Sequence, residues 1–512
     1  MSVKCPLSAT SSHIPTPIMK IDVQTTKPLE FPTPCLILPI WQDEELAGVL
    51  SELNAKTDDL IVELNADGFK GKVGETRTLY TKSQIAAPRV VLVGLGKKEK
   101  FVAQSLRIAA AKAARATREM KRNEVAFLAP TSSLGKEETA AAIVEGVLLG
   151  LHSFDEFKTD DETKNRTKIE SLTLLVEDDA KSAKRGAARG QLLAEASMRA
   201  RYWVNVPSNI KSPQYLALQA QEIARENNLR CEVWDENKIQ SEKMGALFGV
   251  GRGSDNPPRF IILEYCSAGQ ESAAPLILVG KGMTYDTGGY SLKPSTGMED
   301  MKDDMGGAAV VLATMEAVGK QKPNRRIIGL IPSAENMVNG QAQRPGDIVT
   351  ARNGKTIEVL NTDAEGRLIL ADALSYACEL KPTAIVDFAT LTGAISVALG
   401  TEAAGLFAND DAIADKVTAA GEKSGDRVWR FPMWDDYKEH IKSFNADIKN
   451  MGRERRAGSI AAAIFLQHFV QDEIPWAHID IAAVAYTREM QPLTAKGATG
   501  FGVRLALEFL QD

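Results

Sequence analysis

The sequence predicts an α/β fold of two domains, each a mixed and mostly parallel sheet flanked by helices. Two observations point to this class. Apolar runs of strand length alternate with longer segments of helical periodicity along most of the 512 residues. The composition, 44% hydrophobic and 25% charged, is that of a globular chain long enough for two to four domains.

The smaller, N-terminal domain is expected at residues 19–180. Three apolar runs predict strands, the first two buried and parallel: 34–40, 89–96 and 171–176. Two segments with helical spacing predict helices: 105–120 and 137–151. Gly94-Leu95-Gly96 lacks the third glycine and the downstream acid of a dinucleotide-binding loop, so that function is not inferred.

The remaining boundaries follow from local composition. Residues 1–18 are rich in Ser, Thr and Pro and contain no acid, which predicts a disordered N-terminal extension. Residues 181–204 carry Ala, Leu, Arg and Glu at helical spacing and predict a connecting helix. Residues 205–512 again alternate strand and helix and are expected to form the larger domain.

Charge and cysteine usage narrow the possible functions. A net charge of −6 gives no bulk reason to expect nucleic-acid binding. The five cysteines are scattered and form no CxxC pair, which indicates free thiols in a reducing, cytoplasmic compartment. No apolar stretch reaches the ~18–20 residues of a membrane span, so no membrane partner is expected.

The most informative segment is Asn361-Thr362-Asp363-Ala364-Glu365-Gly366-Arg367-Leu368. An alternating run at 356–360 predicts a strand before it, and 368–374 predicts a helix after it. In extended backbone Asp363 and Glu365 would share one face and reach one or two hard cations. Taken alone, Asp363 could also be an ordinary helix N-cap.

A second segment follows the apolar run 275–280. It contains Lys281, Asp286, Lys293 and Asp304. Lys281 lies at the end of a predicted buried strand, where an unpaired ammonium group would be unfavourable. It could pair as a cation with Asp286 and Asp304, or act as a neutral amine ligand beside a metal. Lys293 taken alone would more often be a solvated lysine.

These residues carry a family resemblance. The chain resembles the leucyl aminopeptidases, or cytosol aminopeptidases, of peptidase family M17. The matching text is Val279–Gly282, Asp286–Gly289, Lys293-Pro294, Asp304–Gly307, Arg344–Asp347, Thr390–Ala394, Lys496–Gly500 and the octapeptide. It covers roughly the last three hundred residues well, whereas the first two hundred match the family's variable, macro-like N-terminal domain only loosely. The resemblance implies a cytoplasmic, homohexameric enzyme that releases Leu and other apolar N-terminal amino acids from peptides with a free N-terminus.

The resemblance also implies a role for each motif residue. Lys281, Asp286, Asp304 and Glu365 would hold the tighter of two metal ions, and Asp286, Asp363 and Glu365 the exchangeable one. Lys293 would stabilise the tetrahedral gem-diolate intermediate, and Arg367 would hold a bicarbonate general base. The first side-chain pocket would be formed by Met301, Thr390, Leu391, Gly393, Ala482 and Ala485.

The chemistry of the donors agrees with this implication. Two divalent ions need several negative ligands in one cavity, and the five histidines all lie outside these motifs. Carboxylates with one amine suit Mn²⁺ or Mg²⁺, and Zn²⁺ is also compatible.

Two other functions are alternatives to an aminopeptidase. One is a DNA-binding accessory or regulatory protein of the same family, which the acidic balance disfavours. The other is an inactive structural relative, although every motif residue is intact. The chain departs from its relatives at Tyr285, Tyr290 and the segment 453–456.

Overall fold

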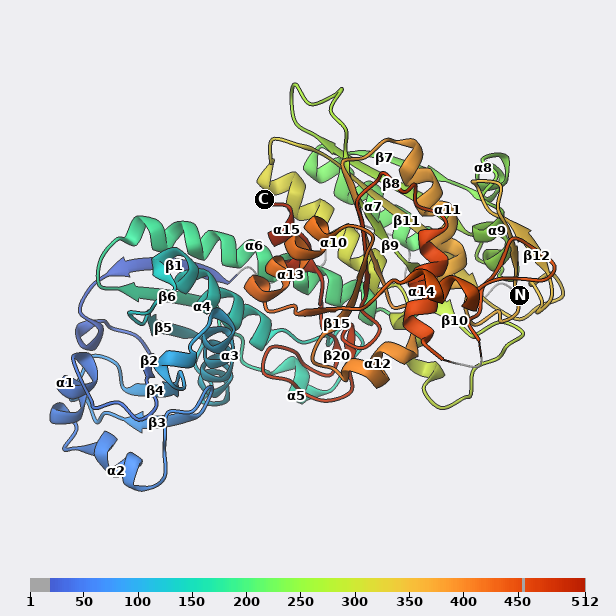
Figure 1. The fold of residues 1–512 in the computed structure, drawn as a ribbon. Coiled ribbons are helices and arrows are strands. Elements are labelled where there is room, and N and C mark those ends of the chain that lie inside the picture. Colours follow the sequence, from blue (N-terminus) through green and yellow to red (C-terminus); the bar gives the residue numbers. More distant parts are fainter. Residues whose placement is uncertain (1–18, 454–455, 512) are drawn as a thin grey trace. The chain divides into compact units, whose positions relative to one another are not determined.

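The computed structural model of the chain describes residues 19–453 and 456–511 (Figure 1). The predicted disordered extension, 1–18, and residues Glu454 and Arg455 of the departing segment lie outside the described residues. The chain divides into two compact units. One contains Asp155–Gln191 and the described residues up to Leu151, and the other contains His152–Phe154 and the chain from Leu192 onward. The division between Gln191 and Leu192 falls within a 26-residue helix, α6 (Ala180–Asn205).

The first unit is built on a six-stranded sheet in the order β1-β6-β5-β2-β4-β3. All neighbours are parallel except β3 and β4. Its strands are β1 (Lys20–Thr25), β2 (Leu36–Ile40), β3 (Thr76–Tyr80), β4 (Arg89–Gly94), β5 (Glu124–Leu128) and β6 (Ser171–Val176). Its helices are α1 (Val49–Lys56), α2 (Leu60–Ala66), α3 (Ala103–Glu119), α4 (Gly135–Leu151) and α5 (Asp161–Lys164).

The strands predicted in this unit are confirmed, and the two long helices differ from prediction by one or two residues at their ends. The structure also gives Gly94 a packing role. A Cβ on Gly94 would lie 2.1 Å from the carbonyl oxygen of Lys72. This glycine therefore allows two backbone segments to touch.

The second unit is built on a nine-stranded sheet in the order β16-β15-β18-β14-β9-β11-β8-β7, with β10 added beside β11. The central strands β18, β14, β9, β11 and β10 are parallel, and antiparallel pairs flank them. The strands are β7 (Arg230–Trp234), β8 (Arg259–Cys266), β9 (Leu276–Gly280), β10 (Gly282–Asp286), β11 (Arg326–Asn336), β14 (Ala384–Ala389), β15 (Ala404–Ala408), β16 (Val428–Arg430) and β18 (Trp476–Asp480). This mixed, mostly parallel sheet confirms the predicted fold class.

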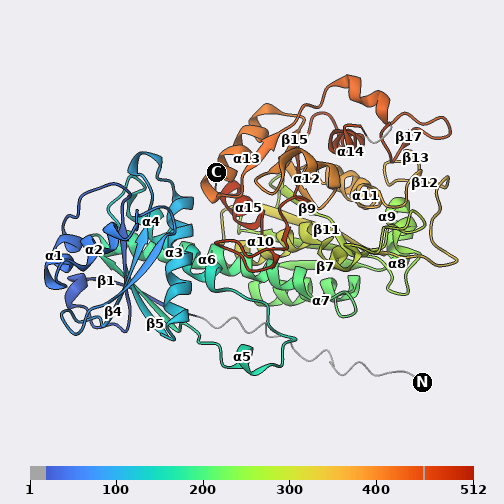
Figure 2. The same ribbon diagram turned by 90° about the horizontal axis from the view of Figure 1, so that it is seen from below.

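Helices cover both faces of this sheet, as Figure 2 shows for α7 and α10 on one side and α9, α11 and α14 on the other. The helices are α7 (Pro213–Asn227), α8 (Glu236–Ser241), α9 (Gly245–Gly251), α10 (Gly306–Gln321), α11 (Gly366–Glu379), α12 (Gly393–Leu399), α13 (Asp411–Ser424), α14 (Gly458–Gln467) and α15 (Val503–Phe509). Within the ranges that the structure describes, none of the helices has the length and apolarity of a bilayer span.

The strand predicted at 356–360 needs a correction. It is β13 (Thr356–Glu358), which ends two residues early and pairs with β12 (Ile348–Thr350) and β17 (Ile448–Lys449) in a separate three-stranded sheet. The helix that follows begins at Gly366, before the predicted 368. The backbone around Asp363 is therefore a turn and not an extended strand end.

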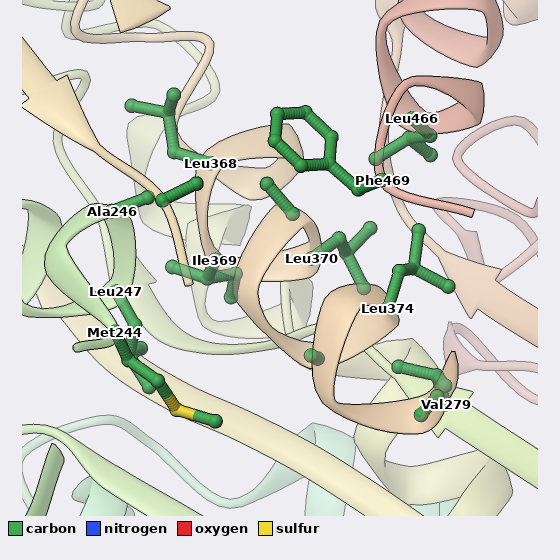
Figure 3. Packing of buried hydrophobic residues seen from close by; sticks show 14 of the residues in the cluster. Met244, Ala246, Leu247, Val279, Leu368, Ile369, Leu370, Leu374, Leu466 and Phe469 are labelled. Atoms are coloured by element: carbon green, nitrogen blue, oxygen red, sulfur yellow. The ribbon is translucent and has the colours of Figure 1, made fainter. Parts of the chain in front are cut away.

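Helix α11, which carries the end of the octapeptide, is held by the core of the unit (Figure 3). Leu370 points toward Leu466 of α14, and Ile369 lies on the side of Leu247 in α9. Val279 of β9 belongs to the same buried cluster. The apolar face of α11 thus fixes the position of the polar residues at its first turn.

We expect Leu370→Ala to lower the free energy of unfolding by about 2–5 kcal/mol, because it empties a fully buried position. Leu218→Ala is the matched control. Leu218 is 45% exposed on α7, and its loss should change stability by about 0.5 kcal/mol or less. Urea unfolding followed by circular dichroism measures both. Equal effects of the two variants would contradict this account of the core.

Candidate metal centre

Polar residues gather where the central strands of the large sheet end. Lys281 follows β9, Asp286 ends β10, Asn336 ends β11 and Thr390 follows β14. These strands are parallel, so their carboxyl ends meet at one edge. In open α/β sheets, ligands bind in the crevice outside this edge.

Lys281 is buried, and its ammonium group contacts three oxygen atoms. Its Nζ lies 2.7 Å from Asp304 Oδ1, 2.9 Å from Glu365 Oε1 and 2.9 Å from the carbonyl oxygen of Thr390. Only 3% of the side chain is exposed. The structure thus brings together Lys281 and Asp304 of the second segment and Glu365 of the octapeptide.

Lys293 joins a second pair of carboxylates. Its Nζ lies 2.8 Å from Asp286 Oδ2 and 2.5 Å from Asp363 Oδ1. The other oxygen of Asp286 accepts hydrogen bonds from Asn336 Nδ2 at 2.8 Å and from the Gly288 amide at 2.9 Å. With 21% of its side chain exposed and two carboxylate partners, Lys293 is not the solvated lysine of the alternative interpretation.

The octapeptide forms a turn that Asn450 holds in place. The Asn450 Nδ2 donates to the carbonyl oxygen of Asn361 at 2.6 Å, and Asn361 Oδ1 accepts from the Asp363 amide at 2.8 Å. The N-cap of α11 is Glu365, whose side chain makes no capping hydrogen bond. The interpretation of Asp363 as an N-cap is therefore wrong, and both carboxylates face the lysines instead.

Two glycines allow the segments to approach this closely. A Cβ on Gly366 would lie 2.5 Å from Lys281 Cε and 2.6 Å from its Nζ. Gly288 has a φ of +85°, and a Cβ there would lie 2.8 Å from Asp363 Oδ1. Gly288 therefore serves both as a turn residue and as a point of close approach.

The charges at this edge are strongly coupled. Burial raises the pKa of Asp304 well above its ordinary value, and Glu365 and Asp286 add to the rise while Lys281 opposes it. Burial and Glu365 likewise raise the pKa of Asp286. Burial alone would lower the pKa of Lys281, but the surrounding carboxylates outweigh it and raise that pKa. In the absence of a metal, Lys281 is thus a cation.

The donor set fits divalent cations. One oxygen from each of Asp286, Asp363 and Glu365 lies within 4.8 Å of the others. Within the part of the chain that the structure describes, Asp304 Oδ2 is buried and has no hydrogen-bond partner. Two ammonium groups face four carboxylates, which leaves negative charge unmatched in a buried place. Hard ions that prefer oxygen ligands would neutralise it.

Arg367 lies in the first turn of α11 and is 7% exposed. Its Nη1 donates to the carbonyl oxygen of Asn450 at 2.8 Å, while Nε has no partner among the described residues. Burial lowers the pKa of Arg367 to about 10, with Glu365 and Asp480 opposing the change. The guanidinium is charged at neutral pH and has donors left for a small anion.

The residues expected around the first side-chain pocket fall into two groups. Thr390 donates through Oγ1 to Asp304 Oδ1 at 2.8 Å, and Thr390 Cγ2 and Ala485 Cβ would both lie within 3.5 Å of a Cβ on Gly306. Leu391 and Ala482 belong to two different loops. The buried carboxylate of Asp480 joins these loops through hydrogen bonds to their backbone amides.

Asp480 Oδ1 accepts from the amides of Leu391 and Ala482, each at 3.2 Å. Met301 lies half-buried in the short helix η3 (Met298–Asp303), and Gly393 is exposed at the start of α12.

Sequence reasoning missed three residues that support the site: Asn336, Asn450 and Asp480. Asn336 and Asp480 each end a buried strand, and a polar residue in that position is a signal that could have identified them. Asn450 lies in a short segment with no such pattern. Its role depends on the fold alone.

The fold and the site define a two-domain α/β protein with a carboxylate-rich cation centre, and comparison with known proteins identifies its family. The profile of the "Cytosol aminopeptidase family, catalytic domain" matches residues 198–507, and that of the family's N-terminal domain matches residues 37–161. The chain belongs to the cytosol aminopeptidase family, which confirms the resemblance inferred from the motifs.

Individual relatives agree along nearly the whole chain. The probable cytosol aminopeptidase of Roseiflexus castenholzii is 45% identical over 501 residues, which cover 96% of this chain and 99% of the relative. That of Solibacter usitatus is 44% identical over 496 residues, 96% of this chain and 99% of the relative.

Two solved structures share the fold. A mutant of tomato leucine aminopeptidase is 34% identical, with a TM-score of 0.89 and coverage of 98% of both chains. The bottromycin maturation enzyme BotP, solved in complex with Mn, is 34% identical, with a TM-score of 0.83 and coverage of 94% of this chain and 99% of its own.

We expect Gly366→Ala to fold but to bind Mn²⁺ at least about tenfold more weakly, because the new methyl group displaces the end of Lys281 from its three acceptors. Gly340→Ala is the control, since a Cβ there meets no atom within 4 Å. Isothermal titration calorimetry with MnCl₂ measures both. Unchanged Mn²⁺ affinity in Gly366→Ala would show that Lys281 need not occupy this position.

Proposed function

We propose that the chain is a two-metal aminopeptidase that releases Leu and other apolar residues from the N-terminus of peptides, a leucyl aminopeptidase in activity. The observation that carries the proposal is the group of four carboxylates around Lys281 and Lys293 at the carboxyl edge of the sheet. Membership of the cytosol aminopeptidase family gives the group its chemical context.

Five residues would hold the ions: Lys281, Asp286, Asp304, Asp363 and Glu365. We assign Lys281 and Asp304 to the tighter ion, Asp363 to the exchangeable one, and Asp286 and Glu365 to both. Two such ions, when bound, supply an activated water and a Lewis acid for the scissile carbonyl. The Mn in BotP and the oxygen-rich donors favour Mn²⁺, with Zn²⁺ or Mg²⁺ as alternatives.

Lys281 must change state when it becomes a ligand. Its ammonium, which donates to Asp304 and Thr390 and forms an ion pair with Glu365, would lose a proton if the amine nitrogen held a metal. Binding of the ion would then be linked to the release of a proton.

Lys293 and Arg367 would act on the reacting groups. Lys293 is partly exposed beside Asp286 and Asp363, so its ammonium can turn toward an oxyanion that develops on the scissile carbonyl. Arg367 would hold a bicarbonate ion through the donors that Asn450 leaves free, and bicarbonate would supply the proton acceptor.

Selection for a free N-terminus has a physical reason. The α-amine of a peptide can pair with a carboxylate such as Asp304, whose Oδ2 has no hydrogen-bond partner among the described residues, whereas an internal peptide bond cannot. Thr390 and Ala485 lie beside this aspartate and would form part of the apolar pocket for the first side chain. Met301, Leu391, Gly393 and Ala482 would complete it.

We also propose a homohexamer in the cytoplasm. The names of the relatives, cytosol aminopeptidases, support the location. Exposed aromatic side chains such as Trp429, Trp434 and Phe444 support an assembly that would cover them. Analytical ultracentrifugation tests the hexamer.

The function is tested by hydrolysis of Leu-p-nitroanilide after chelation and titration with Mn²⁺, Mg²⁺, Zn²⁺ and Co²⁺. N-acetyl-Leu-p-nitroanilide is the control. We expect metal to restore activity and acetylation to abolish it. A folded protein that hydrolyses neither substrate with any of these metals would overturn the proposal.

Lys293→Ala and Arg367→Ala should each lower kcat by roughly 10²-fold or more, because each removes a group that acts on developing charge or on the general base. Both variants should keep their metal, which atomic emission spectroscopy measures after gel filtration. A variant that loses its metal along with its activity would contradict the role given to that residue.

Asp304→Ala and Glu365→Ala should lose activity by a different route, through loss of metal. Each removes an anionic ligand and an acceptor of Lys281. We expect fewer than two ions per chain by the same spectroscopic measurement. Full occupancy in either variant would show that the ligand set is wrong.

A further inference from the structure

We propose that a cavity beside the metal centre, lined by Arg252 and Arg344, binds a carboxylate on the leaving part of the peptide substrate. The inference rests on the proposed aminopeptidase function and names a substrate class for it. Peptides with a carboxylate a short distance after the scissile bond would be preferred.

The cavity has a volume of about 470 Å³ and adjoins the loop that carries Lys293. Tyr290 lines the cavity and directly follows Gly289 in the sequence. Gly289 packs closely against Asn336, because a Cβ added to this glycine would lie 2.8 Å from Asn336 Oδ1. Asn336 in turn donates to Asp286. Tyr290 also donates through its hydroxyl to the carbonyl oxygen of Asn339, which ties the two walls of the cavity together.

The lining of the cavity is positively charged. It contains Arg252 and Arg344 and no acidic residue among those described. Both guanidinium groups contact Asp347, which lies outside the lining, at 3.5 Å for Arg252 and 3.0 Å for Arg344. One carboxylate cannot neutralise two guanidinium groups, so positive charge remains on this wall.

The guanidinium groups have donors to spare. Among the described residues, Asp347 is the single side-chain partner of both guanidinium groups. An arginine offers five N–H donors in a planar fork that matches a carboxylate. Phe248 and Ala342 add an apolar part to the lining, suited to the carbon chain that bears such a group.

The topology places this cavity on the leaving side of the substrate. The sheet runs β18-β14-β9-β11, and β10 pairs with β11. Five of the six residues assigned to the first side-chain pocket follow β14 and β18, and the sixth, Met301, lies in η3 after β10. Tyr290 also follows β10, and the segment 340–344 follows β11. A peptide that places its first side chain on the β14–β18 side and crosses the metal centre extends toward the arginines.

Two sources could supply the carboxylate: the C-terminus of a short peptide, or an Asp or Glu side chain. The probes are Leu-Gly-Gly, its C-terminal amide and Leu-Gly-Asp-amide. Each is used in two forms, a normal peptide for hydrolysis and an analogue whose first amide is replaced by a methyleneamine for calorimetric binding. The protein is the full chain loaded with Mn²⁺.

We expect the free acid to bind wild type at least about tenfold more tightly than the amide, as charge-assisted hydrogen bonds imply. The preference should fall to about twofold or less in Arg252→Gln and in Arg344→Gln. Arg230→Gln is the matched control, because Arg230 is an exposed arginine on β7, paired with Glu264, and should keep the wild-type preference. Tighter binding of Leu-Gly-Asp-amide than of Leu-Gly-Gly-amide would extend the inference to acidic side chains.

Equal binding of acid and amide to wild type would overturn the inference, and so would a preference that survives in Arg252→Gln. Thermal unfolding shows whether Arg344→Gln is folded. If that variant is misfolded, the test uses Arg252→Gln alone. The two proposals fail in different ways. Hydrolysis of the peptides without a preference for the free acid overturns only the proposed carboxylate site. If no peptide is hydrolysed, the proposed aminopeptidase function is overturned, and the calorimetric comparison of acid and amide still tests the carboxylate site.

Discussion

Buried negative charge is the constraint that organises the catalytic unit. Four carboxylates meet at one edge of the sheet, where burial makes each of them costly and raises the pKa of Asp304, Asp286 and Asp363. Two lysines offset part of this cost through contacts of 2.5–2.9 Å. The charge that remains is what makes the edge a place for divalent cations.

The backbone around the site holds the buried charged side chains in position. Gly366 lets the first turn of α11 lie against Lys281, and Asn450 holds the octapeptide turn through its carbonyl groups. Asn336 fixes Asp286 from the end of β11. Behind them, the apolar face of α11 packs into the core, so the positions of the charged groups follow from the packing of the unit (Figure 3).

Local signals in the sequence predicted most of this arrangement. Apolar runs identified the strands β2, β4, β6 and β9, and the motif residues that follow β9 meet those of the octapeptide in space. The run at 356–360 was misleading, because an alternating pattern indicates a strand but cannot say which sheet it joins. Asn450 could not be assigned, since its partners come from a distant segment and depend on the tertiary structure. The arginine cavity could not be predicted for the same reason, because four strands, β8 to β11, lie between Arg252 and Arg344 in the sequence.

The central claim is that the four carboxylates and Lys281 bind two metal ions. The most direct test is anomalous diffraction at the manganese edge from crystals of the protein grown with Mn²⁺. The account predicts two peaks per chain, roughly 3.5–4 Å apart as in other two-metal sites, in contact with Asp286 and Glu365. A single peak, or peaks away from these side chains, would contradict it.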